Sequence, residues 1–195
     1  METDTELSVV TRLRSGDPTA FDEVHAAFNA RLFSFLVRLS RRRDVAEDLL
    51  EETWLRLVTH ARRLRPDTRL APWLFTVARH LYCSYQRSRM LEETHAGSLI
   101  GLWPLGVPRP SPFEETAANE AERRVEAALA SLPAPYREAL LLVGVEGFRP
   151  AEAAELCGVS PEVFRQRLSR ARAKLTRRLE STGGVAAALL TEVTP

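Results

Sequence analysis

The chain is poor in the residues that build disulfide-stabilised or membrane-spanning proteins. Its 195 residues include two cysteines, Cys83 and Cys157, which stand far apart with no metal-ligand spacing around either. No apolar run approaches the roughly 20 residues that a membrane-spanning helix needs. The first 13 residues are acidic and lack the apolar core of a signal peptide. We therefore expect a globular protein of the reducing cytoplasm, without membrane insertion.

The motifs of common enzyme classes are absent as well. There is no nucleophile elbow, phosphate-binding loop or zinc signature, and the histidines His25, His60, His80 and His95 stand singly. The acidic run 44–52 has neither a histidine partner nor the glycine of a calcium-binding loop. We expect no catalytic residue, no metal, no cofactor and no small-molecule substrate.

Charge is nearly balanced overall, with a formal net charge of +1, but it is distributed in blocks. Residues 1–30 carry six acids and two arginines, whereas residues 160–180 carry seven bases and two acids. Residues 56–89 are basic and 90–126 are acidic. Alternating blocks favour separate surfaces for separate partners, while the simpler interpretation of any one block is a solvated helix face.

Hydrophobic residues recur with helical spacing, and no segment has the period of a strand. Helices are expected to end at Ser15-Gly16 and to restart with Asp17 as the cap and Pro18 in the first turn. Further helices are expected over about 45–64, with Val58 on the inward side, and over about 73–89. Prolines and glycines interrupt residues 90–116, and further helices follow to about residue 180. The sequence therefore predicts an all-α protein of two small helical domains, 1–89 and 117–180, with a linker at 90–116 and a tail at 181–195. The apolar stretch 99–105 of the linker either packs on a domain or binds a partner.

A helix-turn-helix is the clearest motif. A short helix over 149–156, a turn containing Gly158, and a longer basic helix capped by Ser160 have the geometry that places a recognition helix in the major groove of DNA. Arg165 and Gln166 stand early in that helix, where arginine can read guanine and glutamine can read adenine. An amphipathic helical hairpin without DNA-binding function is the less favoured interpretation, given seven bases on one helix.

Two other segments carry partner chemistry. Residues 56–89 interleave arginines with Trp73, Tyr82 and Tyr85, a combination that suits melted or single-stranded nucleic acid. The simpler interpretation places Trp73 in the core and Tyr82 half-buried, and composition alone favours it for Trp73. The helix at 44–54 is densely acidic and, without metal-binding features, favours a protein-docking face or a solvated one.

These parts together resemble the sigma-70 family of RNA polymerase sigma factors. The segment 46–57 (AEDLLEETWLRL) resembles the core-polymerase-binding helix, and 73–80 (WLFTVARH) resembles the helix that reads the −10 promoter element. Segments 132–138, 151–160 and 167–172 resemble sigma domain 4. Both halves in this order, and close together, resemble the extracytoplasmic-function (ECF) group. The chain departs from the family pattern at Glu51, His80 and Ser84, where Gln, Asn and Asp are usual.

The resemblance implies a region 2 helical bundle, a region 4 helix-turn-helix, and three partners: core RNA polymerase, promoter DNA and an anti-sigma factor. The residues implied to bind core polymerase are Asp48, Leu49, Glu51, Glu52, Trp54 and Arg56. Those implied at the −10 element are Arg62, Arg63, Arg65, Arg69, Trp73, Arg79, His80, Ser84 and Arg87. Those implied at the −35 element are Pro161, Glu162, Arg165, Gln166, Arg167, Arg170, Arg172 and Lys174.

Two other functions remain open on the residues alone. A free-standing helix-turn-helix regulator would bind duplex DNA by itself, normally as a dimer on two half-sites. A helical enzyme acting on nucleic acid is disfavoured, because no metal or nucleophile constellation is present in the sequence.

Overall fold

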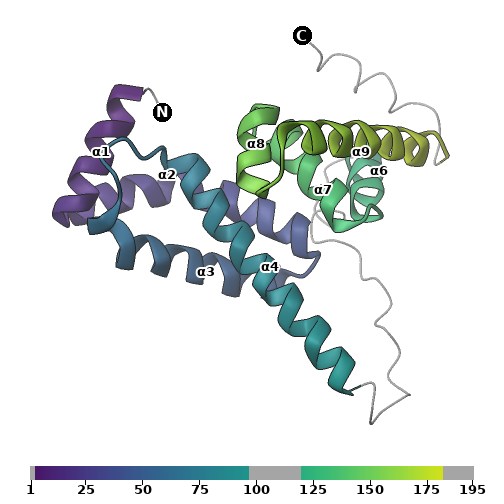
Figure 1. Cartoon of the computed structure of the whole chain (residues 1–195), viewed down its shortest axis with the longest axis horizontal. Helices are drawn as coiled ribbons and strands as arrows, with labels where there is room; N and C mark the ends of the chain where they lie inside the picture. The colour runs from purple at the N-terminus through teal and green to yellow at the C-terminus, as the bar shows by residue number, and fades with distance from the viewer. Residues whose placement is uncertain (1–2, 97–119, 182–195) are drawn as a thin grey trace. The chain divides into compact units, whose positions relative to one another are not determined.

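The computed structural model describes residues 3–96 and 120–181 of the chain (Figure 1). Every regular element within these residues is a helix, which confirms the all-α prediction. The chain divides into two compact units: unit 1 comprises Met1–Leu36 and Asp44–Pro108, and unit 2 comprises Val37–Arg43 and Arg109–Pro195.

Unit 1 is built from four helices. They are α1 (Thr3–Ser15), α2 (Pro18–Ser40), α3 (Arg43–His60) with a single 3-10 turn η1 (Ala61–Arg63), and α4 (Leu70–Ala96). The end of α2 from Val37 and the first residue of α3, Arg43, are exceptions that belong to unit 2. Their inward faces supply an apolar core whose largest fully buried side chains are Leu32, Phe35, Leu36, Leu57, Leu70, Leu74 and Phe75. Phe35 and Phe75 meet edge to face, with ring centroids 5.2 Å apart, so aromatic packing joins α2 to α4.

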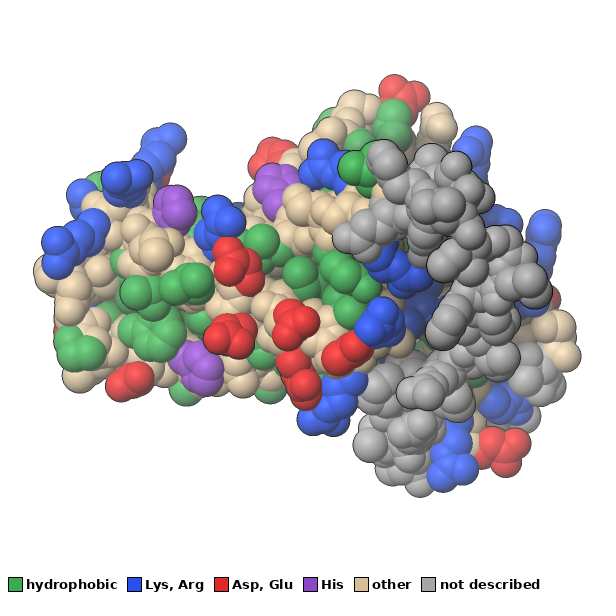
Figure 2. All heavy atoms as spheres, turned by 90° about the horizontal axis from the view of Figure 1, so that it is seen from below, with side chains coloured by type: hydrophobic (Ala, Val, Ile, Leu, Met, Phe, Trp, Pro, Cys, Tyr) green, Lys and Arg blue, Asp and Glu red, His purple; other side chains and the backbone are tan. Residues whose placement is uncertain are grey.

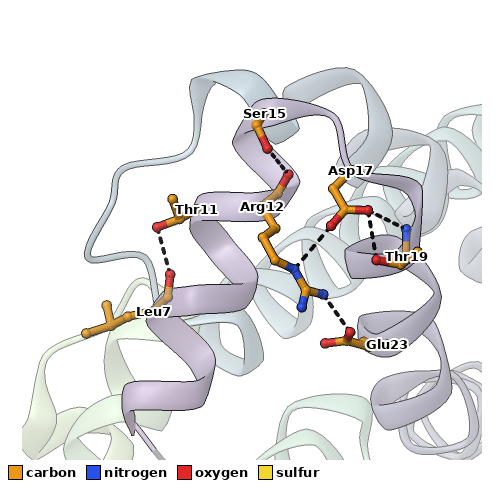
Figure 3. A network of polar contacts seen from close by, with 7 residues as sticks. All are labelled: Leu7, Thr11, Arg12, Ser15, Asp17, Thr19 and Glu23. Carbon is orange, nitrogen blue, oxygen red and sulfur yellow. Dashed lines mark hydrogen bonds and ion pairs between the residues drawn. The ribbon is translucent and has the colours of Figure 1, made fainter.

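The junction between α1 and α2 is fixed by polar contacts (Figure 3). Gly16 adopts a φ of 83°, which favours glycine, and Pro18 opens α2. Asp17 caps α2 as expected: its Oδ1 accepts hydrogen bonds from the backbone N–H of Thr19 at 2.9 Å and from its hydroxyl at 2.8 Å. Arg12 of α1 contacts Asp17 at 3.2 Å and also pairs with Glu23, which closes the network.

This cap makes the junction sensitive to acid. Hydrogen bonds from the side chain and then the backbone of Thr19 hold the pKa of Asp17 below its ordinary value of 3.8. A lowered pKa means that the stabilisation is present above 3.8 and is lost as the pH falls through the pKa of the folded state. Asp17→Ala should therefore lower the melting temperature at neutral pH, and the difference from wild type should shrink below pH 3.8. Asp22→Ala, an exposed acid of the same helix, is the control; an equal, pH-independent loss in both variants would contradict the cap.

The start of α4 depends on a residue far away in sequence. The carboxylate of Glu6 in α1 accepts a hydrogen bond from the backbone N–H of Leu70 at 2.7 Å. The first N–H groups of a helix have no partner within the helix. A negatively charged carboxylate near this end also interacts favourably with the positive end of the helix dipole. The contact ties α1 to the helix expected to read the −10 element.

Three expectations for unit 1 are wrong in detail. Residues 90–96, assigned to the linker, continue α4 to Ala96, because the first helix-breaking residue is Gly97. The helix expected to run to Leu64 ends at His60 and tightens into the 3-10 turn η1. Val58, expected to face inward, is 57% exposed. The remainder of the expected linker, 97–116, and the tail 182–195 lie outside the described residues.

Unit 2 contains α6 (Glu120–Ala130), α7 (Ala134–Leu140), which continues into the π-helical turn η2 (Leu141–Val145), α8 (Pro150–Cys157) and α9 (Pro161–Ser181). Arg137 of α7 is buried and donates hydrogen bonds to the carbonyl of Leu132 at 2.8 Å and to that of Ala130 at 3.4 Å. Ala130 is the last residue of α6 and Leu132 follows it. The last carbonyls of a helix have no hydrogen-bond partner within the helix. The buried guanidinium thus fixes the turn between α6 and α7.

Candidate nucleic-acid and protein interfaces

Unit 2 contains the expected helix-turn-helix in α8 and α9. At the start of α8, the backbone N–H of Arg149 donates a hydrogen bond to the carboxylate of Glu152 at 3.0 Å. At its end, Gly158 has a φ of 63°, the left-handed conformation that terminates many helices. Ser160 then accepts a hydrogen bond from the backbone N–H of Val163 at 3.3 Å, which confirms it as the cap of α9. Local sequence therefore sets both ends of the turn.

The helix α9 is strongly amphipathic. Its buried residues are Phe164, Leu168, Ala171, Leu175 and Leu179. Of the residues expected at the −35 element, those that are exposed are Pro161, Glu162, Arg165, Gln166, Arg170, Arg172 and Lys174. Arg167 differs, because its side chain is only 22% exposed and its Nη1 lies 4.0 Å from the carboxylate of Glu138. Arg167 therefore differs in exposure from the other cations of α9, which the sequence alone does not distinguish.

Unit 1 presents a basic and aromatic surface over the 61–69 loop and α4. Arg62, Arg63, Arg65 and Arg69 are exposed around the loop, and Arg65 pairs with Asp67 at 2.9 Å. Along α4, the half-buried Trp73 and the exposed His80, Ser84 and Arg87 follow at intervals of seven, four and three residues, which places them on one side of the helix. Arg79 is half-buried on the same helix.

Tyr82 does not belong to this surface. The sequence suggested it as a stacking platform, but its side chain is 5% exposed and its hydroxyl accepts a hydrogen bond from Gln86 at 2.6 Å. Trp73 and Tyr85 are half-buried and keep part of their rings accessible. Tyr82 follows Leu74 and Ala78 at intervals of four residues, so it lies on the buried side of α4, whereas Trp73 and His80 lie on the opposite side.

A second kind of surface runs along α3. Asp44, Asp48, Glu51, Leu55 and Val58 are all exposed and follow at intervals of four, three, four and three, so they form one stripe, here called the α3 stripe. Leu55 and Val58 are 54% and 57% exposed, respectively. Neither was among the expected site residues, although their spacing from Asp48 and Glu51 was the signal that could have placed them. Glu52 flanks the stripe and pairs with Arg56 at 2.8 Å.

An apolar groove lies beside the α3 stripe, between α2 and α3. Its lining consists of Phe21, His25, Asn29, Phe33, Glu47, Leu50, Glu51 and Trp54, and its volume is about 510 Å³. His25 lies against Trp54 with ring centroids 4.8 Å apart, and the indole N–H of Trp54 donates to Asn29 at 3.0 Å. Seen from the side on which α3 lies, acidic side chains gather beside apolar surface (Figure 2).

Burial divides the residues expected to bind core polymerase. Asp48, Glu51 and Arg56 are exposed, and Glu52 is half-buried. Leu49 and Trp54 are each 8% exposed; Leu49 belongs to the core, and Trp54 is buried and lines the groove. Glu51 alone of the six lies both in the α3 stripe and in the groove lining.

Two kinds of site are not found within residues 3–96 and 120–181. No helix there is both long and apolar enough to cross a membrane. No three of the histidine, cysteine, aspartate and glutamate side chains described gather as metal ligands do.

The fold and its surfaces define an all-helical protein with a helix-turn-helix unit, the class to which many DNA-binding transcription proteins belong. Family comparison refines this class. Residues 25–91 match the family described as Sigma-70 region 2, and residues 122–175 match Sigma-70, region 4. The chain is 36% identical to the ECF RNA polymerase sigma factor EcfG of Rhodopseudomonas palustris (strain TIE-1), over 83% of this chain and 86% of that protein. It is 31% identical to the RNA polymerase sigma factor CarQ of Myxococcus xanthus, over 84% and 91%.

Solved structures agree with these relatives. The fold is similar to that of the sigma factor RpoE in complex with the anti-sigma factor NepR from Bartonella quintana, with a TM-score of 0.67, 28% identity, and coverage of 82% of this chain and 96% of that one. It is also similar in fold to CnrH in complex with the cytosolic domain of CnrY, with a TM-score of 0.66, 21% identity, and coverage of 90% and 97%. This chain belongs to the sigma-70 family, in its ECF group, as the sequence resemblance indicated.

Proposed function

We propose that this chain is a cytoplasmic initiation subunit that binds core RNA polymerase and directs it to promoters by reading −10 and −35 elements. The observation that carries the proposal is the presence of three chemically different surfaces on one chain. They are the α3 stripe with its groove, the basic surface of the loop and α4, and the basic helix α9. A free-standing regulator needs only the last of these.

The α3 stripe and the α2–α3 groove are the proposed docking site for core polymerase. Exposed carboxylates at Asp48 and Glu51 supply charge, while Leu55, Val58 and the groove supply apolar contact. Protein interfaces combine an apolar centre with a charged rim, and complementary charge accelerates association. Leu49 and Trp54 support this surface from the core.

The loop and α4 are proposed to bind the −10 element. Arginines around the loop would follow phosphates, and the accessible parts of Trp73 and Tyr85 would stack against unpaired bases. His80, Ser84 and Arg87 lie on the same side of α4 as Trp73, so they are placed to contact the same strand.

The helix α9 is proposed to read the −35 element in the major groove. Arg165 and Gln166 lie in its second turn, both exposed, where a recognition helix contacts base edges. Arg170, Arg172 and Lys174 follow and suit contacts to phosphates. Pro161 and Glu162 form the exposed start of the helix.

Domain organisation follows from these assignments. We propose that the region 2 domain extends to the end of α4 at Ala96 and that the region 4 domain includes α6 to α9.

We also propose that an anti-sigma factor regulates this chain. RpoE from Bartonella quintana and CnrH were each solved in complex with a partner, in the first case a named anti-sigma factor.

Promoter binding should depend on core polymerase. The chain carries a net charge of only +1, so its general attraction to DNA is small and readily screened. With core enzyme at physiological salt, we expect tight binding to a promoter duplex; without core enzyme, we expect weak and unselective binding. Fluorescence anisotropy with both forms measures this difference. Nanomolar, dimer-dependent and sequence-specific binding by the chain alone would instead support the free-standing regulator.

Base reading by α9 can be tested separately. Arg165→Ala and Gln166→Ala should each reduce discrimination between a matched and a mutated −35 element by about 1–3 kcal/mol. Lys174→Ala should weaken binding to both elements alike, because a phosphate contact carries no sequence information. Competition between the two duplexes for the holoenzyme gives the ratio. Unchanged preference in Arg165→Ala would show that α9 docks in a different register.

A further inference from the structure

Arg167 occupies a different environment from the other cations of α9. Arg165, Arg170, Arg172 and Lys174 are exposed, whereas the side chain of Arg167 is 22% exposed. In a helix with 3.6 residues per turn, Arg167 lies about 200° around the axis from Arg165. The two arginines therefore start from nearly opposite sides of α9.

The carboxylate of Glu138 faces Arg167. Glu138 lies in α7 and is 5% exposed. Its Oε2 lies 4.0 Å from Nη1 of Arg167 and 3.6 Å from the Sγ of Cys157, which donates to it. Cys157 is the last residue of α8, so one carboxylate oxygen faces both helices of the helix-turn-helix. Removing a carboxylate from water is costly, and nearby cationic and hydrogen-bonding groups offset this cost.

We infer that Arg167 is a positioning residue that Glu138 holds, and that it does not contact DNA. This inference rests on the proposed function of α9. The pair supports the orientation of α9 against α7 that the buried Phe164 and Leu168 also set, and so helps to keep Gln166 and Arg170 facing outward. If Arg167 turned to a DNA phosphate, the buried carboxylate would lose a nearby cation, which opposes that movement.

Lys174 provides an internal comparison. It follows Arg167 by seven residues, so it lies within about 20° of the same side of α9. Its Nζ stands 5.7 Å from the ring centroid of Tyr136, also in α7, but the side chain is exposed. Lys174 can reach a phosphate without leaving a buried acid behind. The two residues share a side of the helix and differ in the partner beneath them.

The test uses the full chain bound to core polymerase and measures promoter affinity against salt concentration, with matched and mutated −35 duplexes. Lys174→Gln should lower the magnitude of the salt slope by about 1, the value for one lost phosphate contact. Arg167→Gln should leave the slope unchanged and reduce −35 discrimination about twofold to tenfold, the lower part of the range for coupled neighbours. Glu138→Gln should do the same, and the double variant should be no worse than either single one. Arg167→Lys, which keeps the charge, should restore part of the discrimination.

Distinct results overturn the inference. A fall of about 1 in the salt slope for Arg167→Gln would identify a direct phosphate contact. Additive losses in the double variant would show that Glu138 and Arg167 act independently. If the wild-type holoenzyme itself showed no −35 preference, the proposed function would fail first, and this outcome is separate from any result on the variants.

Discussion

Charge reversal of two carboxylates on the α3 stripe, Asp48→Lys with Glu51→Lys, is expected to abolish the binding of core RNA polymerase. Both side chains are exposed, and Glu51 also lines the α2–α3 groove. Placing like charges opposite each other at an interface costs several kcal/mol, so affinity should fall by a factor on the order of 100 or more. Titration of labelled core enzyme with the purified chain measures the loss.

Matched variants decide whether the effect belongs to the surface. The neutral pair Asp48→Asn with Glu51→Gln should show an intermediate loss, because it removes attraction without adding repulsion. Asp22→Lys alters an exposed acid of α2 that does not line the groove, and it should retain binding. Unaltered melting temperatures confirm folding. Full binding by the double reversal would mean that the acids are only a solvated helix face.

Truncation of Phe164 should unfold the helix-turn-helix while leaving polymerase docking intact. Phe164 is fully buried in α9, and replacing a buried phenylalanine by alanine typically costs about 3–5 kcal/mol. The free energy of unfolding of a small domain is about 5–15 kcal/mol, so this loss is a large fraction of the stability expected for unit 2. Phe164→Ala should therefore abolish −35 discrimination and retain binding to core polymerase. Calorimetry should show a second, lower-temperature transition.

The neighbouring residue supplies the control. Val163 precedes Phe164 in the same turn and is 48% exposed, so Val163→Ala should change the unfolding temperature little. One transition that shifts as a whole in Phe164→Ala would contradict independent folding of the two proposed domains. It would also show that the two halves of the chain stabilise each other.

Sequence by itself determined the elements of this protein and its family. Hydrophobic spacing gave the helices, because a helix that buries one side must repeat its apolar residues at three and four. The turns were also local: Asp17 caps α2, and Gly158 and Ser160 set the helix-turn-helix, because the backbone conformation at each depends on the residue that occupies it. The end of α4 was misplaced because the linker was taken to begin at residue 90, whereas the first helix-breaking residue of that segment is Gly97.

Tertiary structure decided which residues of each helix remain available. The interleaving of aromatic residues with arginines placed Tyr82 among the stacking residues, and apolar spacing placed Val58 in the core. Packing reverses both, because burial depends on which neighbouring helices cover each side. The contacts of Glu6 with Leu70 and of Glu138 with Arg167 span 64 and 29 residues, so no local pattern encodes them. Seven bases on α9 are alike in sequence. A buried carboxylate on another helix distinguishes Arg167 from the rest, because the free energy of a charge depends on what surrounds it in space.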